Sequence, residues 1–190
     1  DTQSFDDALK SSLRQAPDVI LIGEIRSMET MEYAMSFADT GHLCVATLHA
    51  NNANQAIERI MHLAPKDQHD KLRFDLSLNI RAIVAQQLVP TTDGKGRVAA
   101  IEILLNAPLV TDLIQRNEIG MLKEAMMKGK EQGMQSFDMA IYALYKENRI
   151  TEEQAMQNAD SPNDLRLMIR LDSQDGTGLG SLSYVSIDMG

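Results

Sequence analysis

Residues 19–49 read VILIGEIRSMETMEYAMSFADTGHLCVATLH, and this stretch decides the fold class of the 190-residue chain. It contains two apolar runs, residues 19–22 and 43–47, of the kind found in buried parallel strands. Between them Ser27 can cap a helix, which Gly41 would end. The apolar face of that helix would carry Met28, Met31, Met35 and Ala38. The stretch therefore predicts a strand, a helix and a second strand of one parallel sheet.

The alternation of elements continues on both sides of this stretch. A helical pattern over residues 53–64 ends at Pro65, and a further helix is predicted over residues 68–79. Residues 80–89 are apolar without a clear period, residues 92–96 form a turn, and residues 97–105 alternate like a strand. Helices are predicted at about residues 108–116, 119–128, 136–147 and 152–159. We expect an α/β fold with a partial parallel sheet in residues 1–105 and a helical region in residues 106–171.

The two ends of the chain carry different patterns. Phe5, Leu9 and Leu13 lie on one face of a predicted helix, which suggests a chain cut from a larger parent. Residues 172–190 are rich in Gly, Ser and Asp and contain no basic residue, so we expect a disordered acidic tail.

Composition excludes several classes of function. The 18 basic and 27 acidic residues give a net charge of −9, which argues against nucleic-acid binding through overall charge. No apolar stretch approaches the ~20 residues that span a bilayer, and no signal peptide is indicated. The single cysteine, Cys44, excludes an internal disulfide and a multi-cysteine zinc site and is expected to be buried. We expect a protein of a reducing compartment, without a transmembrane segment.

Polar side chains follow both predicted strands of residues 19–49. Glu24 comes two residues after the first strand and His49 two residues after the second. Ligands of open parallel sheets bind at the carboxyl ends of the strands, where a carboxylate can orient water or hold hydrated Mg²⁺ and a histidine can contact phosphate. Asn51 and Asn52 could cap a helix that favours anions. The alternative is a solvated loop glutamate and a surface histidine.

His42 precedes the strand that His49 follows. At ~3.3 Å per residue the two lie ~20 Å apart and cannot share a metal, so a structural or interface role is favoured for His42. A phosphate loop, G-x-x-x-x-G-K-[ST], is absent from the 190 residues, because Gly94-Lys95 and Gly129-Lys130 lack the other required positions.

Two segments resemble a known family. Residues 13–26, LRQAPDVILIGEIR, resemble the Walker B segment of the ATPases of type II secretion and type IV pili. Residues 40–49, TGHLCVATLH, resemble their His box. The resemblance covers residues 1 to about 165. It implies a RecA-like ATPase domain in a hexameric ring, with the Walker A loop upstream of Asp1.

The resemblance also implies roles for individual residues. Glu24 would support Mg²⁺ through water and the attacking water itself, and His49 would contact the γ-phosphate of ATP. Gly23, Thr47 and His42 would be further nucleotide contacts. One departure is Ser27, where the family usually has Asp; Ser27 can still cap the helix, but an ion pair made by that Asp would be absent.

The chain resembles the retraction branch of the family, the PilT/PilU ATPases. It has no cysteine after Cys44, whereas assembly ATPases carry a four-cysteine insert there. Residues 109–115, LVTDLIQ, lack both arginines of the PilT-type segment, which together with the acidic tail favours the accessory PilU type. A PilT type with a drifted helix is the near alternative.

The resemblance implies a function, which we state as an expectation. The chain would belong to a homohexameric motor that hydrolyses ATP during pilus retraction, in the cytoplasm at the inner membrane. Its partners would be a second retraction ATPase and the inner-membrane pilus platform protein. These 190 residues alone would be inactive because they lack the phosphate loop. The alternative is a non-hydrolytic accessory ring subunit that acts through protein contacts.

Overall fold

The computed structural model describes residues 8, 11, 15 and 17–175 and divides the chain into two compact units. Unit 1 consists of Asp1–Gln87 and Ile101–Ser136, and unit 2 of Leu88–Ala100 and Phe137–Gly190. Apart from Ala8 and Ser11, the helix predicted over residues 5–13 lies outside the described residues, as does the predicted tail beyond residue 175.

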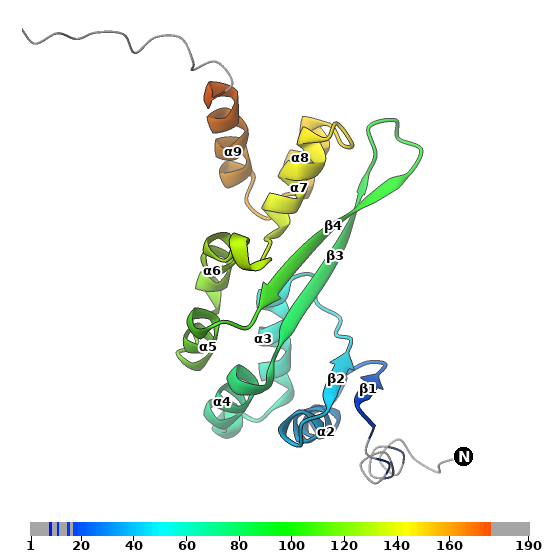
Figure 1. Cartoon of the computed structure of the whole chain (residues 1–190), viewed down its shortest axis with the longest axis vertical. Helices are drawn as coiled ribbons and strands as arrows, with labels where there is room; N and C mark the ends of the chain where they lie inside the picture. The colour runs from blue at the N-terminus through cyan, green and yellow to red at the C-terminus, as the bar shows by residue number, and fades with distance from the viewer. Residues whose placement is uncertain (1–7, 9–10, 12–14, 16, 176–190) are drawn as a thin grey trace, which may run out of the picture. The chain divides into compact units, whose positions relative to one another are not determined.

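The sheet of unit 1 is parallel, as predicted. Strand β1 (Val19–Ile22) pairs with β2 (Leu43–Ala46), and α2 (Met28–Asp39) connects them (Figure 1). Ser27 Oγ accepts a hydrogen bond from Thr30 N at 3.3 Å and caps α2. Gly41 follows the helix at a φ of +89°, a conformation that favours glycine. The α/β class predicted from this stretch is confirmed.

Burial of β1 differs from the expectation. Ile20 and Ile22 belong to the core of unit 1 with Phe37 of α2, but Val19 and Leu21 are 56% and 73% exposed. The prediction that β1 is buried on both faces is therefore wrong for the described residues, because their helices cover only one face of the two-stranded sheet.

The remaining helices of unit 1 extend this core. They are α3 (Ala53–Leu63), η1 (Lys66–Gln68), α4 (His69–Asn79), α5 (Pro108–Gln115), η2 (Ile119–Met121), α6 (Leu122–Lys128) and η3 (Lys130–Gln132). Helix α4 packs against α2, α3 and α5. The side-chain amide of Asn106 donates to the carbonyls of Ser77 and Ile80 at 2.9 Å, and its oxygen accepts from the Thr111 hydroxyl at 2.9 Å. Asn106 thus joins the end of α4 to α5.

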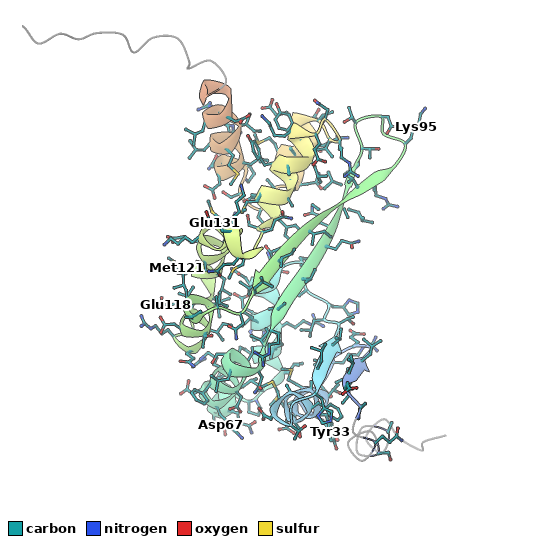
Figure 2. All side chains as sticks on the ribbon, viewed as in Figure 1. Tyr33, Asp67, Lys95, Glu118, Met121 and Glu131 are labelled. Atoms are coloured by element: carbon teal, nitrogen blue, oxygen red, sulfur yellow. The ribbon has the colours of Figure 1, made fainter. Side chains whose placement is uncertain are left out.

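A second two-stranded sheet consists of β3 (Ala82–Pro90) and β4 (Arg97–Leu105). The apolar stretch that the sequence left ambiguous is therefore largely a strand. Figure 2 shows Lys95 at the turn that joins the two strands. Each strand contributes residues to both units, so the predicted boundary after residue 105 does not coincide with the division into units.

Unit 2 contains α7 (Phe137–Lys146), α8 (Glu152–Asn158) and α9 (Pro162–Asp175), which pack on one another. Helix α9 was not among the individually predicted helices, and it continues past residue 171, so the predicted start of the tail at residue 172 is wrong. Among residues 162–172 of α9, whose burial is described, only Leu165 is fully buried, which leaves a weak apolar pattern. The start of the helix is fixed by Asp138 of α7, whose carboxylate accepts from Ser161 N at 3.2 Å.

Candidate functional site

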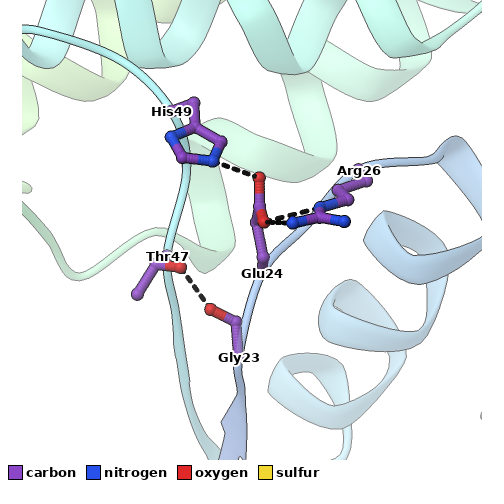
Figure 3. A network of polar contacts seen from close by, with 5 residues as sticks. All are labelled: Gly23, Glu24, Arg26, Thr47 and His49. Carbon is purple, nitrogen blue, oxygen red and sulfur yellow. Dashed lines mark hydrogen bonds and ion pairs between the residues drawn. The ribbon is translucent and has the colours of Figure 1, made fainter.

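Glu24 and His49 meet beyond the ends of β1 and β2 (Figure 3). His49 Nε2 lies 3.0 Å from Glu24 Oε1. The two segments stay together after the strands end, because Ile25 N donates to Thr47 O at 3.0 Å. Parallel pairing thus brings together two side chains that are 25 positions apart in the sequence. They lie at the edge of the sheet where ligands of open parallel sheets bind.

Arg26 is a second partner of Glu24. Its Nε donates to Glu24 Oε2 at 2.5 Å, and a second guanidinium nitrogen contacts the same oxygen. The hydrogen bond from Arg26, with the charges of Arg26, His49 and Arg59, holds the pKa of Glu24 below its ordinary value. Both carboxylate oxygens therefore have a basic partner.

Exposure differs sharply across this triad. The Glu24 side chain is 17% exposed, whereas those of Arg26 and His49 are 76% and 74% exposed. Exposed ion pairs contribute little to stability. The side chains of Arg26 and His49 are both accessible to an anion in solvent.

Thr47 and Gly23 form the base of the site. The Thr47 hydroxyl donates to the Gly23 carbonyl and links the segments that follow the two strands. Next along the chain, Asn52 caps α3 by accepting from Gln55 N at 2.9 Å, in line with the predicted capping segment.

His42 does not join this group. Its Nδ1 lies 2.9 Å from the Thr40 hydroxyl and 3.2 Å from the Phe37 carbonyl, and its ring stands edge-on to that of Phe37, with centroids 6.1 Å apart. These contacts attach the start of β2 to the end of α2. A nucleotide contact of His42 stays a prediction.

Cys44 is half-buried in β2, and burial raises the pKa of its thiol. An open apolar groove of about 760 Å³ runs beside this strand. It is lined by residues of α2, β2, α3, α4 and β3, including Thr47 and His42 but neither Glu24 nor His49. Residues 43–46 of β2 and residues 82–85 of β3 line this groove.

No group of three or more His, Cys, Asp and Glu suited to a metal occurs among the described residues. Mg²⁺ does not need one, since it commonly binds one or two carboxylates and takes its other ligands from water and substrate phosphates. The carboxylate of Glu24 fits such a role through a water molecule. In the part of the chain that the structure describes, no helix has the length and apolarity needed to cross a membrane.

Two further residues were missed in the sequence. Arg26 lies in the quoted Walker B segment but was given no role; its position two residues after Glu24, in the same exit segment, was the available signal. Glu102 of β4 is 2% exposed and accepts from Ala53 N at 2.7 Å. Its signal was a lone acidic residue that alternates with apolar ones on one face of a predicted strand.

The chain is similar in sequence to known proteins. Residues 2–137 match the family described as "Type II/IV secretion system protein". The "Type IV pilus ATPase PilU" of Pseudomonas aeruginosa is 62% identical over 184 residues, which cover 96% of this chain and 48% of that protein. The "Twitching motility protein" of Neisseria gonorrhoeae is 38% identical over 164 residues, 86% of this chain and 44% of its own.

A solved structure agrees with these sequence matches. A crystal structure of the pilus retraction motor PilT with bound ADP aligns with a TM-score of 0.78 and 39% identity, over 88% of this chain and 47% of that chain. The predicted resemblance and fold class are confirmed. The chain spans about half the length of these relatives.

Proposed function

Because the chain belongs to the Type II/IV secretion system protein family, we propose that it forms part of a motor ATPase that hydrolyses ATP to drive type IV pilus retraction. The observation that carries the proposal is the contact of Glu24 with His49 beyond two parallel strands. Two relatives, named as a PilU ATPase and as a twitching motility protein, agree with it. Identity to the PilU relative exceeds that to the PilT structure, which favours the accessory PilU type.

The proposed chemistry gives each residue of the site one task. Glu24, held ionised by its neighbours, orients the attacking water and accepts its proton. His49 turns from Glu24 to the terminal phosphate, and Thr47 with Gly23 keeps the two segments at fixed separation. Glu24 would hold Mg²⁺ through water, and that ion would neutralise phosphate charge. His42 stays the least supported of the nucleotide contacts, because it lies against Phe37 and Thr40.

We infer that the phosphate loop lies outside these 190 residues, because they contain no match to its pattern. The open groove beside β2 and the exposed outer face of β1 support this, since both are apolar surfaces that further chain would cover. We therefore expect the 190-residue chain alone to bind ATP weakly and not to hydrolyse it.

The proposal includes the assembly and its partners. We propose a homohexameric ring at the cytoplasmic side of the inner membrane that acts with a second retraction ATPase and the pilus platform protein. Sedimentation of the longer protein with and without nucleotide tests the ring.

The direct test compares ATP hydrolysis by the longer protein that includes the phosphate loop with that of its Glu24→Gln variant. Glu24→Gln keeps the shape of the side chain but removes the base, so turnover should fall by at least about 100-fold. Glu32→Gln, an exposed carboxylate of α2, serves as the matched control and should leave turnover unchanged. Undiminished hydrolysis in Glu24→Gln would sink the assignment. No hydrolysis in the parent would instead favour the non-hydrolytic ring subunit.

A further inference from the structure

Glu102 is an acidic residue on an otherwise apolar face of β4. It is 2% exposed and shares its face with Val98, Ala100 and Leu104, all of them buried. Its Oε1 accepts a hydrogen bond from Ala53 N at 2.7 Å, across 49 positions of sequence. A buried carboxyl group is costly unless its hydrogen bonds are made, so this contact constrains where Ala53 can lie.

Ala53 is the first residue of α3, and its amide is one of those that a helix cannot satisfy internally. The neighbouring amides are held as well. Asn52 accepts from Gln55 N at 2.9 Å, and the Gln55 side chain accepts from Asn51 N at 3.2 Å. These two hydrogen bonds are local, whereas the one that Glu102 accepts from Ala53 N connects this segment to a distant part of unit 1.

The strand segment that carries Glu102 is itself firmly held. Ile103 and Gln135 exchange backbone hydrogen bonds in both directions at 2.7 and 2.9 Å. The Gln135 side chain donates to the Ile101 carbonyl at 2.8 Å. Glu102 thus projects from a backbone that is anchored on either side of it.

His49 lies between this anchor and the end of the sheet. On the sheet side, Thr47 is bound to Gly23 and Ile25. On the helix side, Glu102 fixes Ala53. Only a short turn, in which Ala50 N donates to Leu48 O, separates the two anchors. We propose that Glu102 is a positioning residue, which holds the start of α3 so that His49 reaches Glu24.

The effect of Glu102 on ATP turnover rests on the proposed function. The positioning of His49 by Glu102, however, can be tested in the 190-residue chain without any hydrolysis. Diethyl pyrocarbonate acylates histidine, and mass spectrometry gives the rate for each site. In the parent chain Nε2 of His49 is engaged by Glu24, which slows its acylation. His62, which is exposed, supplies the internal control.

Three substitutions at Glu102 separate positioning from simple loss of fold. Glu102→Gln keeps an acceptor oxygen and should match the parent chain. Glu102→Asp withdraws the acceptor, and Glu102→Met removes it; both should raise acylation of His49 by about fivefold, the equilibrium factor of one ordinary hydrogen bond, with His62 unchanged. If Glu102→Met does not fold, the comparison of Glu102→Asp with Glu102→Gln decides.

A Glu24→Ala background, which removes the oxygen that His49 contacts, completes the test. If Glu102 acts through the His49 contact, Glu24→Ala alone raises His49 acylation, and adding Glu102→Asp gives no further rise. Unchanged His49 acylation in folded Glu102→Asp and Glu102→Met chains overturns the proposal. If the rates change as expected while the longer protein hydrolyses no ATP, the positioning stands and the proposed function fails.

Discussion

The carboxylate of Glu24 contacts two basic side chains, those of Arg26 and His49. Arg26 offers a hydrogen bond with two nitrogens, and His49 offers one ring nitrogen. The arginine hydrogen bond is the largest cause of the lowered pKa of Glu24. A carboxyl group with a lowered pKa stabilises the folded chain at any pH above its ordinary pKa, and this stabilisation is lost as the pH falls through the lowered pKa. The contact of Arg26 with Glu24 therefore stabilises the folded chain at neutral pH.

We therefore expect Arg26→Gln to raise the pKa of Glu24 towards its ordinary value of 4.5. Arg26→Lys should give a smaller rise, because it keeps the charge but loses the planar pair of donors. Carbon-13 NMR titration of the Glu24 carboxyl group measures this directly. An unchanged Glu24 pKa in Arg26→Gln would show that Arg26 does not hold the carboxylate in solution.

A second expectation concerns Thr47. Thr47→Val removes the hydroxyl that links β2 to the Gly23 carbonyl and should lower the free energy of unfolding by about 0.5 kcal/mol, the low end for an intramolecular hydrogen bond because the site is exposed. Thr47→Ser retains the hydroxyl and should lower the free energy of unfolding by less. Urea unfolding of the two variants checks this, and equal stability of Thr47→Val and the parent would contradict it.

At the scale of helices and strands, the segment from β1 to α3 could be predicted from the sequence, whereas some other elements could not. The segment from β1 to α3 was predicted because each element carries its own marks: Ser27 and Asn52 as caps, Gly41 as a stop, and apolar runs with the right period. Glu24 and His49 could be placed together because parallel strands share a carboxyl edge.

Other features depend on tertiary contacts that leave no local pattern. Glu102 alternates with apolar residues, but no neighbouring residue in the sequence indicates that its partner is Ala53, 49 positions away. Within the part of α9 whose burial is described, Leu165 alone is completely buried, and the carboxylate that fixes the start of the helix belongs to α7.

The start of α9 offers a test at this scale. Asp138→Leu leaves Ser161 N without its acceptor and should cost about 1–2 kcal/mol of unfolding free energy. Asp138→Asn retains a side-chain oxygen and should cost less. Hydrogen exchange of the first-turn amides of α9 measures the effect where it arises, and unchanged exchange in Asp138→Leu would contradict it.

The other end of α9 carries a pH-dependent contact. Lys146 of α7 and Asp172 form an ion pair; its hydrogen bond is the largest cause both of the lowered pKa of Asp172 and of the raised pKa of Lys146. The stabilisation should be complete between the ordinary values of 3.8 and 10.5. It should be lost as the pH falls through the lowered pKa of Asp172 or rises through the raised pKa of Lys146.

Asp172→Asn should therefore lower the melting temperature at pH 7 but not at a pH low enough to protonate Asp172. Lys146→Met should also lower the melting temperature at pH 7, and the double variant should lose no more than Asp172→Asn alone, because Asp172 also has a hydrogen bond with Tyr142. Thermal melts across the pH range check this. A difference from the parent that persists unchanged in strong acid would exclude the ion pair as its cause.

For the molecule as a whole, the decisive feature is apolar surface without cover in the described residues. Leu21 of β1 and Val45 of β2 are 73% and 45% exposed. We expect the 190-residue chain to bind a hydrophobic dye and to associate as its concentration rises. Leu21→Lys with Val45→Lys should reduce both effects.

Leu167→Lys, which changes a 55% exposed leucine of α9, is the matched control for that pair of substitutions. It should leave dye binding largely intact, because it lies outside the sheet. If the control and the Leu21→Lys, Val45→Lys variant reduced dye binding equally, the exposed face of the sheet would not be the surface that binds the dye.

Unit 1 is assembled from two stretches of chain, with the turn of the β3–β4 hairpin between them. A protease cut or a split-protein junction at Gly94-Lys95 would therefore yield halves that each hold part of unit 1, Ala53 on one and Glu102 on the other. The halves should stay associated after the peptide bond is broken. Any chimera between relatives that exchanges the first 87 residues must carry residues 101–136 with them, or it will separate the acid from the helix it holds.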